Sequence, residues 1–256
     1  MIPAPPSRPA RWASAPARWV GALRAHGGAG LDLVLPRTCP GCGAPEPWCA
    51  RCAVTLGPVR AVRLPDAALD AAAGLALPPV YALAGYHGAP RAAVLHGKER
   101  GRRDLPARLG VPLGEGLAVL VRAGVLLRDP WLVPAPSRRS AARARGGDPV
   151  TAMARSAART LARQGLAAGV APCLSTAAGA VDSVGLGARE RVRNLAGRVR
   201  YAPRAAPPAG AVVVLVDDVV TSGATVLAAC RVLADHGRPV SAVLCVAAAP
   251  SLLRRP

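Results

Sequence analysis

The chain has 256 residues, of which 52% are apolar, 18% charged and 3% aromatic, and its formal net charge is +19. This length and apolar content allow a buried core and exclude global disorder. No stretch is apolar and long enough for a transmembrane helix or for a signal peptide, so we expect a cytoplasmic protein.

The strong basic excess has two explanations. A polyanionic partner such as nucleic acid would account for it, and so would a gene rich in GC codons, which favour Arg over Lys. The 33 basic residues include a single Lys, Lys98, and the chain has a single Asn, Asn194. Residues that persist against such a codon bias are expected to be needed where they stand.

The first third of the chain changes character three times. Residues 1–30 are rich in Pro, Ala, Gly and Arg and are predicted to be a flexible basic tail. Residues 31–56 contain four closely spaced cysteines, and residues 57–79 have no clear periodicity and are interpreted as a connector. From residue 80 to the C-terminus the pattern is that of a globular domain, 80–256.

Within this domain, short apolar runs alternate with amphipathic segments. We expect helices where apolar residues recur at helical spacing, and Thr151 is the expected cap of one of them. Alternating strands and helices of this length predict an α/β fold with a parallel sheet flanked by helices. The expected strands are 80–86, 131–135, 212–216 and 240–246, and the expected helices are 89–95, 107–123, 151–164 and 225–236.

The cysteines form two Cys-x2-Cys pairs, Cys39 with Cys42 and Cys49 with Cys52. Two such pairs supply the four thiolates of a tetrahedral structural zinc site, and in a reducing compartment metal is favoured over disulfides. A redox dithiol or a metal-free knuckle remains the alternative. The other three cysteines have apolar neighbours and are expected to be core residues.

The most informative segment starts with the run 212–216, which predicts a buried strand ending in Asp217 and Asp218. A loop of small residues follows and then the predicted helix 225–236. At the carboxyl end of a parallel strand, a helix start offers N–H groups to a phosphate, and the two carboxylates suit a sugar diol or hydrated Mg²⁺. Gly223 is expected to leave room for the anion.

Three alternatives to a sugar-phosphate site differ in the residues that they need. A Walker-type NTPase needs a Gly-Lys-Ser/Thr loop, and Lys98 is followed by Glu99, so this class is excluded. A Rossmann dinucleotide site would use Gly185 and Gly187, but no buried strand leads into them. The remaining alternative is a strand end with solvated acids and a polar turn.

The segment 217–225 resembles the phosphoribosyl-diphosphate (PRPP) motif of type I phosphoribosyltransferases. The resemblance implies that Asp217 and Asp218 contact the ribose hydroxyls and that Mg²⁺ binds with PRPP. A third carboxylate present in some purine-using members is replaced by Thr221, so a reaction would use a nucleophile that needs no such base, or a base from elsewhere in the chain. The residues implied to hold the 5′-phosphate are Thr221, Ser222, Gly223, Ala224 and Thr225.

Over residues 31–250 the chain resembles the ComF family of competence-associated proteins. Lys98 and Asn194 both fall on motif positions of that family, whereas its usual Arg-Gly-Phe-Asn-Gln segment is replaced by 145–149, Arg-Gly-Gly-Asp-Pro. The other matching pieces are Leu35–Cys39 with the two Cys-x2-Cys pairs, Tyr86-His-Gly, Val133–Pro136 with Arg138 and Arg139, Arg143–Gly146, and the stretch from Leu186 through Arg189 to Asn194.

The resemblance implies an enzyme that transfers phosphoribose from PRPP and releases pyrophosphate. Arg138, Arg139 and Arg189 are candidates for holding the pyrophosphate, together with Lys98 and Asn194. Two other function classes stay open: a non-catalytic PRPP sensor, and an adaptor in DNA uptake that contacts single-stranded DNA or a competence helicase. The low aromatic content speaks against a base-stacking platform.

Overall fold

The computed structural model describes residues 37–72, 74–127, 129–138, 147–177, 195 and 197–254. The chain divides into a first unit, 1–37, and a second unit, 38–256, which contains all the elements discussed below. The expected basic tail, 1–30, lies outside the described residues. Within the described part, none of the helices combines the length and apolar character that crossing a membrane would require.

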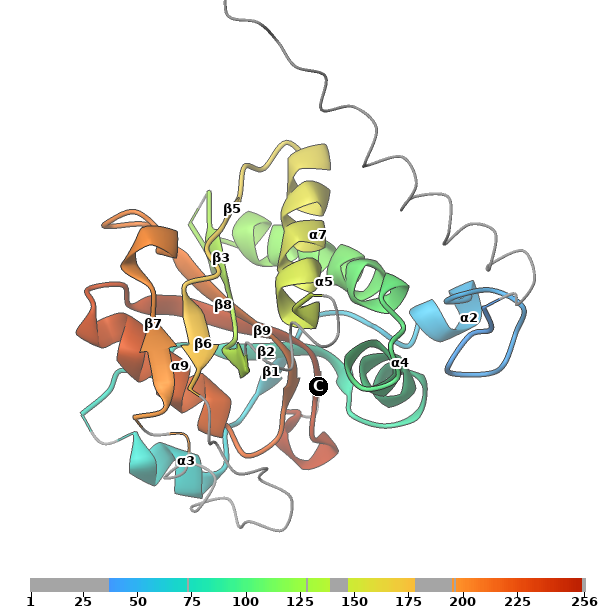
Figure 1. Ribbon diagram of the computed structural model, residues 1–256, viewed down its shortest axis with the longest axis horizontal. Helices are drawn as coiled ribbons and strands as arrows, with labels where there is room; N and C mark the ends of the chain where they lie inside the picture. Colours follow the sequence, from blue (N-terminus) through green and yellow to red (C-terminus); the bar gives the residue numbers. More distant parts are fainter. Residues whose placement is uncertain are drawn as a thin grey trace, which may run out of the picture. The chain divides into compact units, whose positions relative to one another are not determined.

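A six-stranded sheet forms the centre of the second unit (Figure 1). Its order is β1-β2-β9-β8-β3-β5; all neighbouring pairs are parallel except β1 with β2 at one edge. The middle strands are apolar on both faces because helices cover both sides, as is typical of parallel sheets. The strands are β1 (Arg60–Val62), β2 (Val80–Gly85), β3 (Trp131–Pro134), β5 (Gly169–Val170), β8 (Val213–Val220) and β9 (Val240–Ala248).

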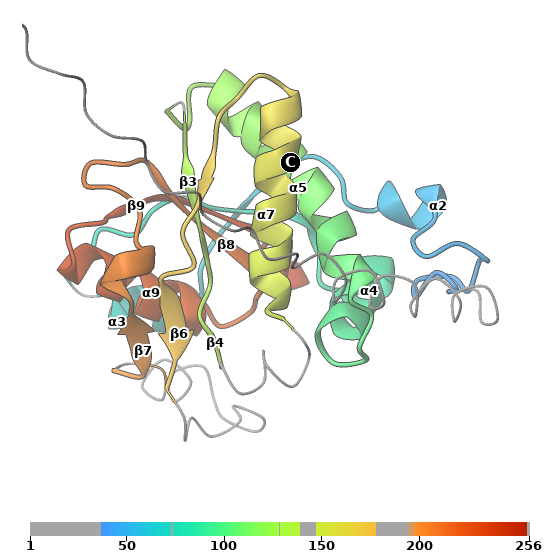
Figure 2. The same ribbon diagram turned by 45° about the horizontal axis from the view of Figure 1, so that its top comes forward.

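Helices cover the two faces of this sheet (Figures 1 and 2). On one face lie α4 (Gly88–Lys98), α5 (Asp104–Arg122) and α7 (Pro149–Arg163); on the other lie α3 (Asp66–Ala71) and α9 (Ala224–Asp235). Helices α5 and α7 pack closely because Gly110 and Gly114 of α5 face α7, where a Cβ would collide with the α7 backbone. This layering is the predicted α/β fold with a mostly parallel sheet.

A small second sheet and several short helices complete the fold. The second sheet has the order β4-β6-β7, with β4 (Ser137–Arg138) parallel to β6 (Leu174–Thr176) and β7 (Val199–Tyr201) antiparallel to β6. Helix α2 (Ala50–Ala53) belongs to the cysteine segment. The single-turn helices η1 (Pro203–Ala205) and η2 (Pro250–Leu252) follow β7 and β9.

Three details differ from the sequence-based expectations. The expected strand 212–216 continues to Val220, so both acids lie inside β8 and not after it. The segment 57–79, interpreted as a connector, contains β1 and α3; β1 is too short for a period to be visible in the sequence. The expected cap Thr151 is wrong, because Asp148 caps α7 and accepts the N–H of Thr151.

Candidate functional site

Asp217 and Asp218 lie next to each other in β8, and their exposed fractions are only 6% and 4%. Successive side chains of a strand point to opposite faces of the sheet, so the two carboxylates are expected to diverge. The surroundings agree: Asp217 lines a hollow with the loop before α9, and Asp218 lines another with residues of α4, α5 and α7. The strand therefore presents one acid to each face of the sheet.

Asp218 is held by Lys98, the single lysine of the chain. The Lys98 Nζ atom lies 2.8 Å from Asp218 Oδ2, and the lysine side chain is about half exposed (47%). Lys98 is the last residue of α4, which places its ammonium above the carboxyl half of β8. Burial alone would lower the pKa of Lys98, but the charges of Asp218 and Asp217 outweigh it and raise that pKa above the usual value.

Asp217 is in the opposite electrostatic situation. Burial and the neighbouring charge of Asp218 raise the pKa of Asp217 well above its usual value, and Lys98 offsets only part of this. Its Oδ1 accepts the backbone N–H of Asp218 at 2.8 Å. A raised carboxyl pKa in a hollow is typical of functional sites, because burial is tolerated there for the sake of chemistry.

The loop 221–223 leads from β8 into α9 and forms the second part of this site. Thr221 is exposed, whereas Ser222 is buried; together with Asp217 and the first turn of α9 they line an open hollow of about 200 Å³. The first N–H groups of α9 have no carbonyl partner within the helix, and the helix dipole is positive at this end. The loop and the helix start can therefore bind a phosphate.

The structure shows a reason for Gly223 besides the expected room for an anion. Its φ of 74° lies in the left-handed region, and a Cβ there would meet Leu64 at 3.1 Å and Ala68 at 3.3 Å. The glycine thus fits the loop against the segment that carries α3.

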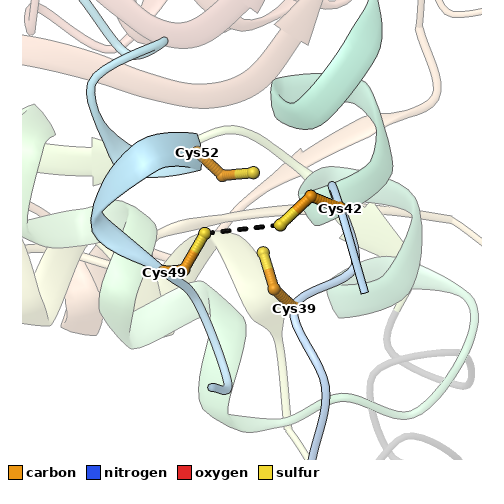
Figure 3. A group of neighbouring side chains, drawn as sticks. All are labelled: Cys39, Cys42, Cys49 and Cys52. Atoms are coloured by element: carbon orange, nitrogen blue, oxygen red, sulfur yellow. Dashed lines mark hydrogen bonds between the residues drawn. The ribbon is translucent and has the colours of Figure 1, made fainter. Parts of the chain in front are cut away.

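The four clustered cysteines form a separate centre (Figure 3). Their sulfur atoms point toward one another and all lie within 4.8 Å of each other, with Cys42 Sγ and Cys49 Sγ 3.5 Å apart. Four thiolates about 2.3 Å from a zinc ion would be separated by about 3.8 Å, so the donor set and its size fit zinc. The N–H of Ala44 and the side chain of Arg51 lower the pKa of Cys42 to about 6, which favours its thiolate form.

Arg102 joins the cysteine segment to the turn between α4 and α5. Its guanidinium donates to the carbonyl of Thr38 at 2.8 Å and to that of Pro47 at 2.9 Å, and it forms a two-pronged pair with Asp104. Thr38 precedes the first cysteine pair and Pro47 precedes the second. The cysteine segment is thereby attached to the connection that follows Lys98.

Residues 176–255 match the family of the phosphoribosyl transferase domain. The matched range includes β7, β8, the loop 221–223, α9 and β9, and so contains both acids and the loop that follows them. No curated protein matches the chain. The phosphoribosyl transferase domain and the cysteine cluster both agree with the expectations drawn from the sequence.

The side chains of the remaining predicted site residues are not described by the structure. Arg139, Arg189 and Asn194 lie outside the described residues. Arg138 is placed only as part of the backbone of β4, which follows β3 directly.

The end of the segment 145–149 has a structural role. Asp148 caps α7 through Oδ2, and Pro149 begins the helix. A capping signal of Asp-Pro before an amphipathic run is visible in the sequence and could have identified Asp148.

Proposed function

We propose that this protein is a ComF-like phosphoribosyltransferase that binds PRPP together with Mg²⁺. The observation that carries the proposal is the hollow formed by Asp217, the loop 221–223 and the start of α9, within the part that matches the phosphoribosyl transferase domain. The loop and helix start would hold the 5′-phosphate, and Asp217, which lines the same hollow, would contact the ribose hydroxyls. Asp218, which the PRPP motif also implies for the ribose, pairs with Lys98 on the other face of β8. Carboxylates also suit Mg²⁺, which would neutralise charge on the pyrophosphate.

In the proposed reaction a nitrogen of the acceptor attacks the anomeric carbon of PRPP. The bond from this carbon to the pyrophosphate oxygen breaks, its electron pair leaves with pyrophosphate, and the acceptor loses its N–H proton to a base or to water. Lys98, which pairs with Asp218, would place a positive charge beside the site. Arg138, Arg139, Arg189 and Asn194 would contact the pyrophosphate as it leaves.

Calorimetric titration with Mg²⁺–PRPP tests the binding step. PRPP should stabilise the fold by about 2.7 kcal/mol at a hundredfold excess over its dissociation constant, since it binds the folded chain alone. Asp217→Asn combined with Asp218→Asn should abolish PRPP binding and this stabilisation, and leave the zinc content unchanged. Asp235→Asn is the matched control, because Asp235 is an exposed residue at the other end of α9 from the hollow. Unchanged PRPP binding in the double variant would contradict the assignment.

Turnover needs a separate experiment. Exchange of labelled pyrophosphate into PRPP, measured across a panel of bases and nucleic acids, distinguishes an enzyme from a PRPP sensor. The proposal expects exchange with at least one acceptor and its loss in Asp217→Asn. PRPP binding without exchange under any acceptor would favour the sensor.

The net charge of +19 favours a second candidate, an adaptor in natural competence that contacts single-stranded DNA or a helicase. ComF-like proteins are associated with this process, and an enzyme could also serve it. Electrostatic binding to single-stranded DNA should weaken steeply between low and moderate salt, because it depends on counterion release. Filter binding at two salt concentrations measures this, and binding that is insensitive to salt would contradict an electrostatic contact.

A further inference from the structure

Helix α7 presents a row of arginines to solvent, away from the PRPP site. Three arginines and two alanines recur there at the spacing i, i+3, i+4, i+7, i+8, which places them on one side of the helix. We name this set the α7 stripe: Arg155, Ala158, Arg159, Ala162 and Arg163. Its arginines are exposed and follow one another at about 6 Å along the helix axis, because they are four residues apart.

The charge of the α7 stripe is not neutralised by neighbouring acids. Within the part of the chain that the structure describes, Arg155 and Arg159 have no hydrogen-bond or ion-pair partner. Helix α7 itself contains no acidic residue. On α5, by contrast, Arg108 pairs with Asp104. A codon bias explains the number of arginines in the chain, but it does not explain why this helix has no acid to balance them.

The neighbouring face of α5 adds one charge of opposite sign. Gly114 of α5 lies against Ala157 and Thr160 of α7. The next residue of α5, Glu115, is exposed and is therefore level with Arg159. The outer face of these two helices thus carries an acid beside a row of bases, with small apolar side chains between the bases.

This pattern restricts the kind of partner that fits. Carboxylates four residues apart on a helix also repeat at about 6 Å, and each could accept two hydrogen bonds from one guanidinium. The alanines of the α7 stripe leave room for a second helix to approach closely. Glu115 would meet a basic residue at the edge of the same partner helix, as charges flank the contact in coiled coils.

A nucleic-acid strand fits this face less well than a helix does. Its phosphates would be repelled by Glu115, and neither α5 nor α7 contains an aromatic residue on which bases could stack. A helix can match both signs of charge, whereas a phosphate backbone carries only one. The charges of the face therefore favour a protein partner.

We propose that the outer face of α5 and α7 docks an acidic amphipathic helix of a protein partner, whose carboxylates pair with the arginines of the α7 stripe. A helix laid along a complementary surface is one of the common modes of peptide recognition. The inference is independent of the proposed function, because neither Asp217 nor the loop 221–223 enters it.

Binding of synthetic peptides to the full zinc-loaded chain tests the inference by fluorescence anisotropy. The main probe has about 20 residues, enough to form a helix alone, and carries Glu at every fourth position among Ala, Leu and Gln. A second peptide of identical composition has its Glu residues spread around the helix. At about 0.15 M salt, which screens distant charges, the first peptide should bind at least about 10-fold more tightly than the second.

Double variants assign this binding to the α7 stripe. Arg155→Gln with Arg159→Gln should weaken binding of the first peptide by about 10-fold, because two charge pairs are lost. The matched control is Arg200→Gln with Arg204→Gln, which removes the same charge from exposed positions of β7 and η1 and should bind as the wild type does. Arg155→Glu with Arg159→Glu should instead prefer a peptide in which Lys replaces Glu.

A single-stranded dT oligonucleotide distinguishes the other class of partner. Its binding should be the same in the Arg155→Gln, Arg159→Gln variant as in the control variant. An oligonucleotide that loses affinity only in the former would make the α7 stripe a nucleic-acid surface and overturn the inference. Absence of binding by the first peptide, equal weakening in both double variants, or an unchanged preference in the charge-reversed variant would also overturn it.

Discussion

The cysteine cluster and the Asp217 site are built in opposite ways. All four thiols come from one short segment with a single turn of helix, and they converge without help from the sheet. The Asp217 site joins a strand, a loop and a helix start with Lys98 from a distant helix. The first depends on local chain geometry and can hold a metal, whereas the second depends on the packing of the whole sheet.

The two regions are nevertheless attached to each other. Arg102 donates hydrogen bonds to two carbonyls of the cysteine segment and lies four residues after Lys98 in the chain. Ala89 of α4 also packs against the cysteine cluster. Damage to one region should therefore reach the other weakly, through these two contacts. The following predictions test that separation.

The largest effect is expected from Cys52→Ser. The variant should lose the single zinc ion and upwards of about 4 kcal/mol of the free energy of unfolding, because a structural metal site folds around its ion. Metal analysis and denaturant unfolding measure both quantities. Cys230 is a buried cysteine of α9 outside the cluster, so the control variant Cys230→Ala should still bind one zinc ion. Stoichiometric zinc in Cys52→Ser would contradict the prediction.

Arg102→Met should have the next largest effect and lower the free energy of unfolding by about 2 kcal/mol. The hydrogen bonds of Arg102 to two carbonyls and to Asp104 are lost together in this variant. Zinc transfer to a chromogenic chelator should also become faster. Arg108→Met is the control, since Arg108 pairs with the same Asp104 at 3.7 Å from an exposed position. Equal zinc release rates in the two variants would show that Arg102 does not join the regions.

Lys98→Met should lower the free energy of unfolding by about 1 kcal/mol, because it leaves the buried Asp218 without its cation. The loss is limited because the lysine itself is half exposed and its charge is screened by solvent. The raised pKa of Lys98 means that this contribution is fully present below the usual lysine pKa and is lost as pH rises through the folded value. Arg63→Met breaks an exposed pair and should change stability by less than about 0.5 kcal/mol. Denaturant unfolding at neutral pH that finds equal effects would refute this ranking.

The smallest expected effect is an increase in thermal stability. Asp217→Asn should raise Tm of the ligand-free protein, by roughly 2–4 °C for each kcal/mol of relieved repulsion, because it removes a buried charge beside Asp218. An unfolded Asp loses its proton at lower pH than Asp217 does in the fold, so wild-type stability falls as pH rises through the folded pKa. The advantage of Asp217→Asn should grow over that window. Thermal scans at several pH values measure it, and an advantage that shrinks with rising pH would contradict the raised pKa.

Some of this protein could be read directly from its sequence. The spacing of Cys39, Cys42, Cys49 and Cys52 is enough to predict their cluster, because residues so close along the chain have few ways to separate. The order of apolar strand, acids, small-residue loop and helix predicted the arrangement around Asp217, and alternation of strands and helices predicted the α/β fold. These are local patterns, and neighbouring residues alone determine them.

Only the tertiary structure decided the rest. It extended β8 past the acids, because pairing with β9 continues to Val220, and so sent Asp217 and Asp218 to different faces. It brought Lys98 to Asp218, placed Leu64 against Gly223, and made Asp148 the cap of α7. Each of these depends on which distant elements pack together, and that is set by burial of the whole apolar core, a property that no short stretch of sequence contains.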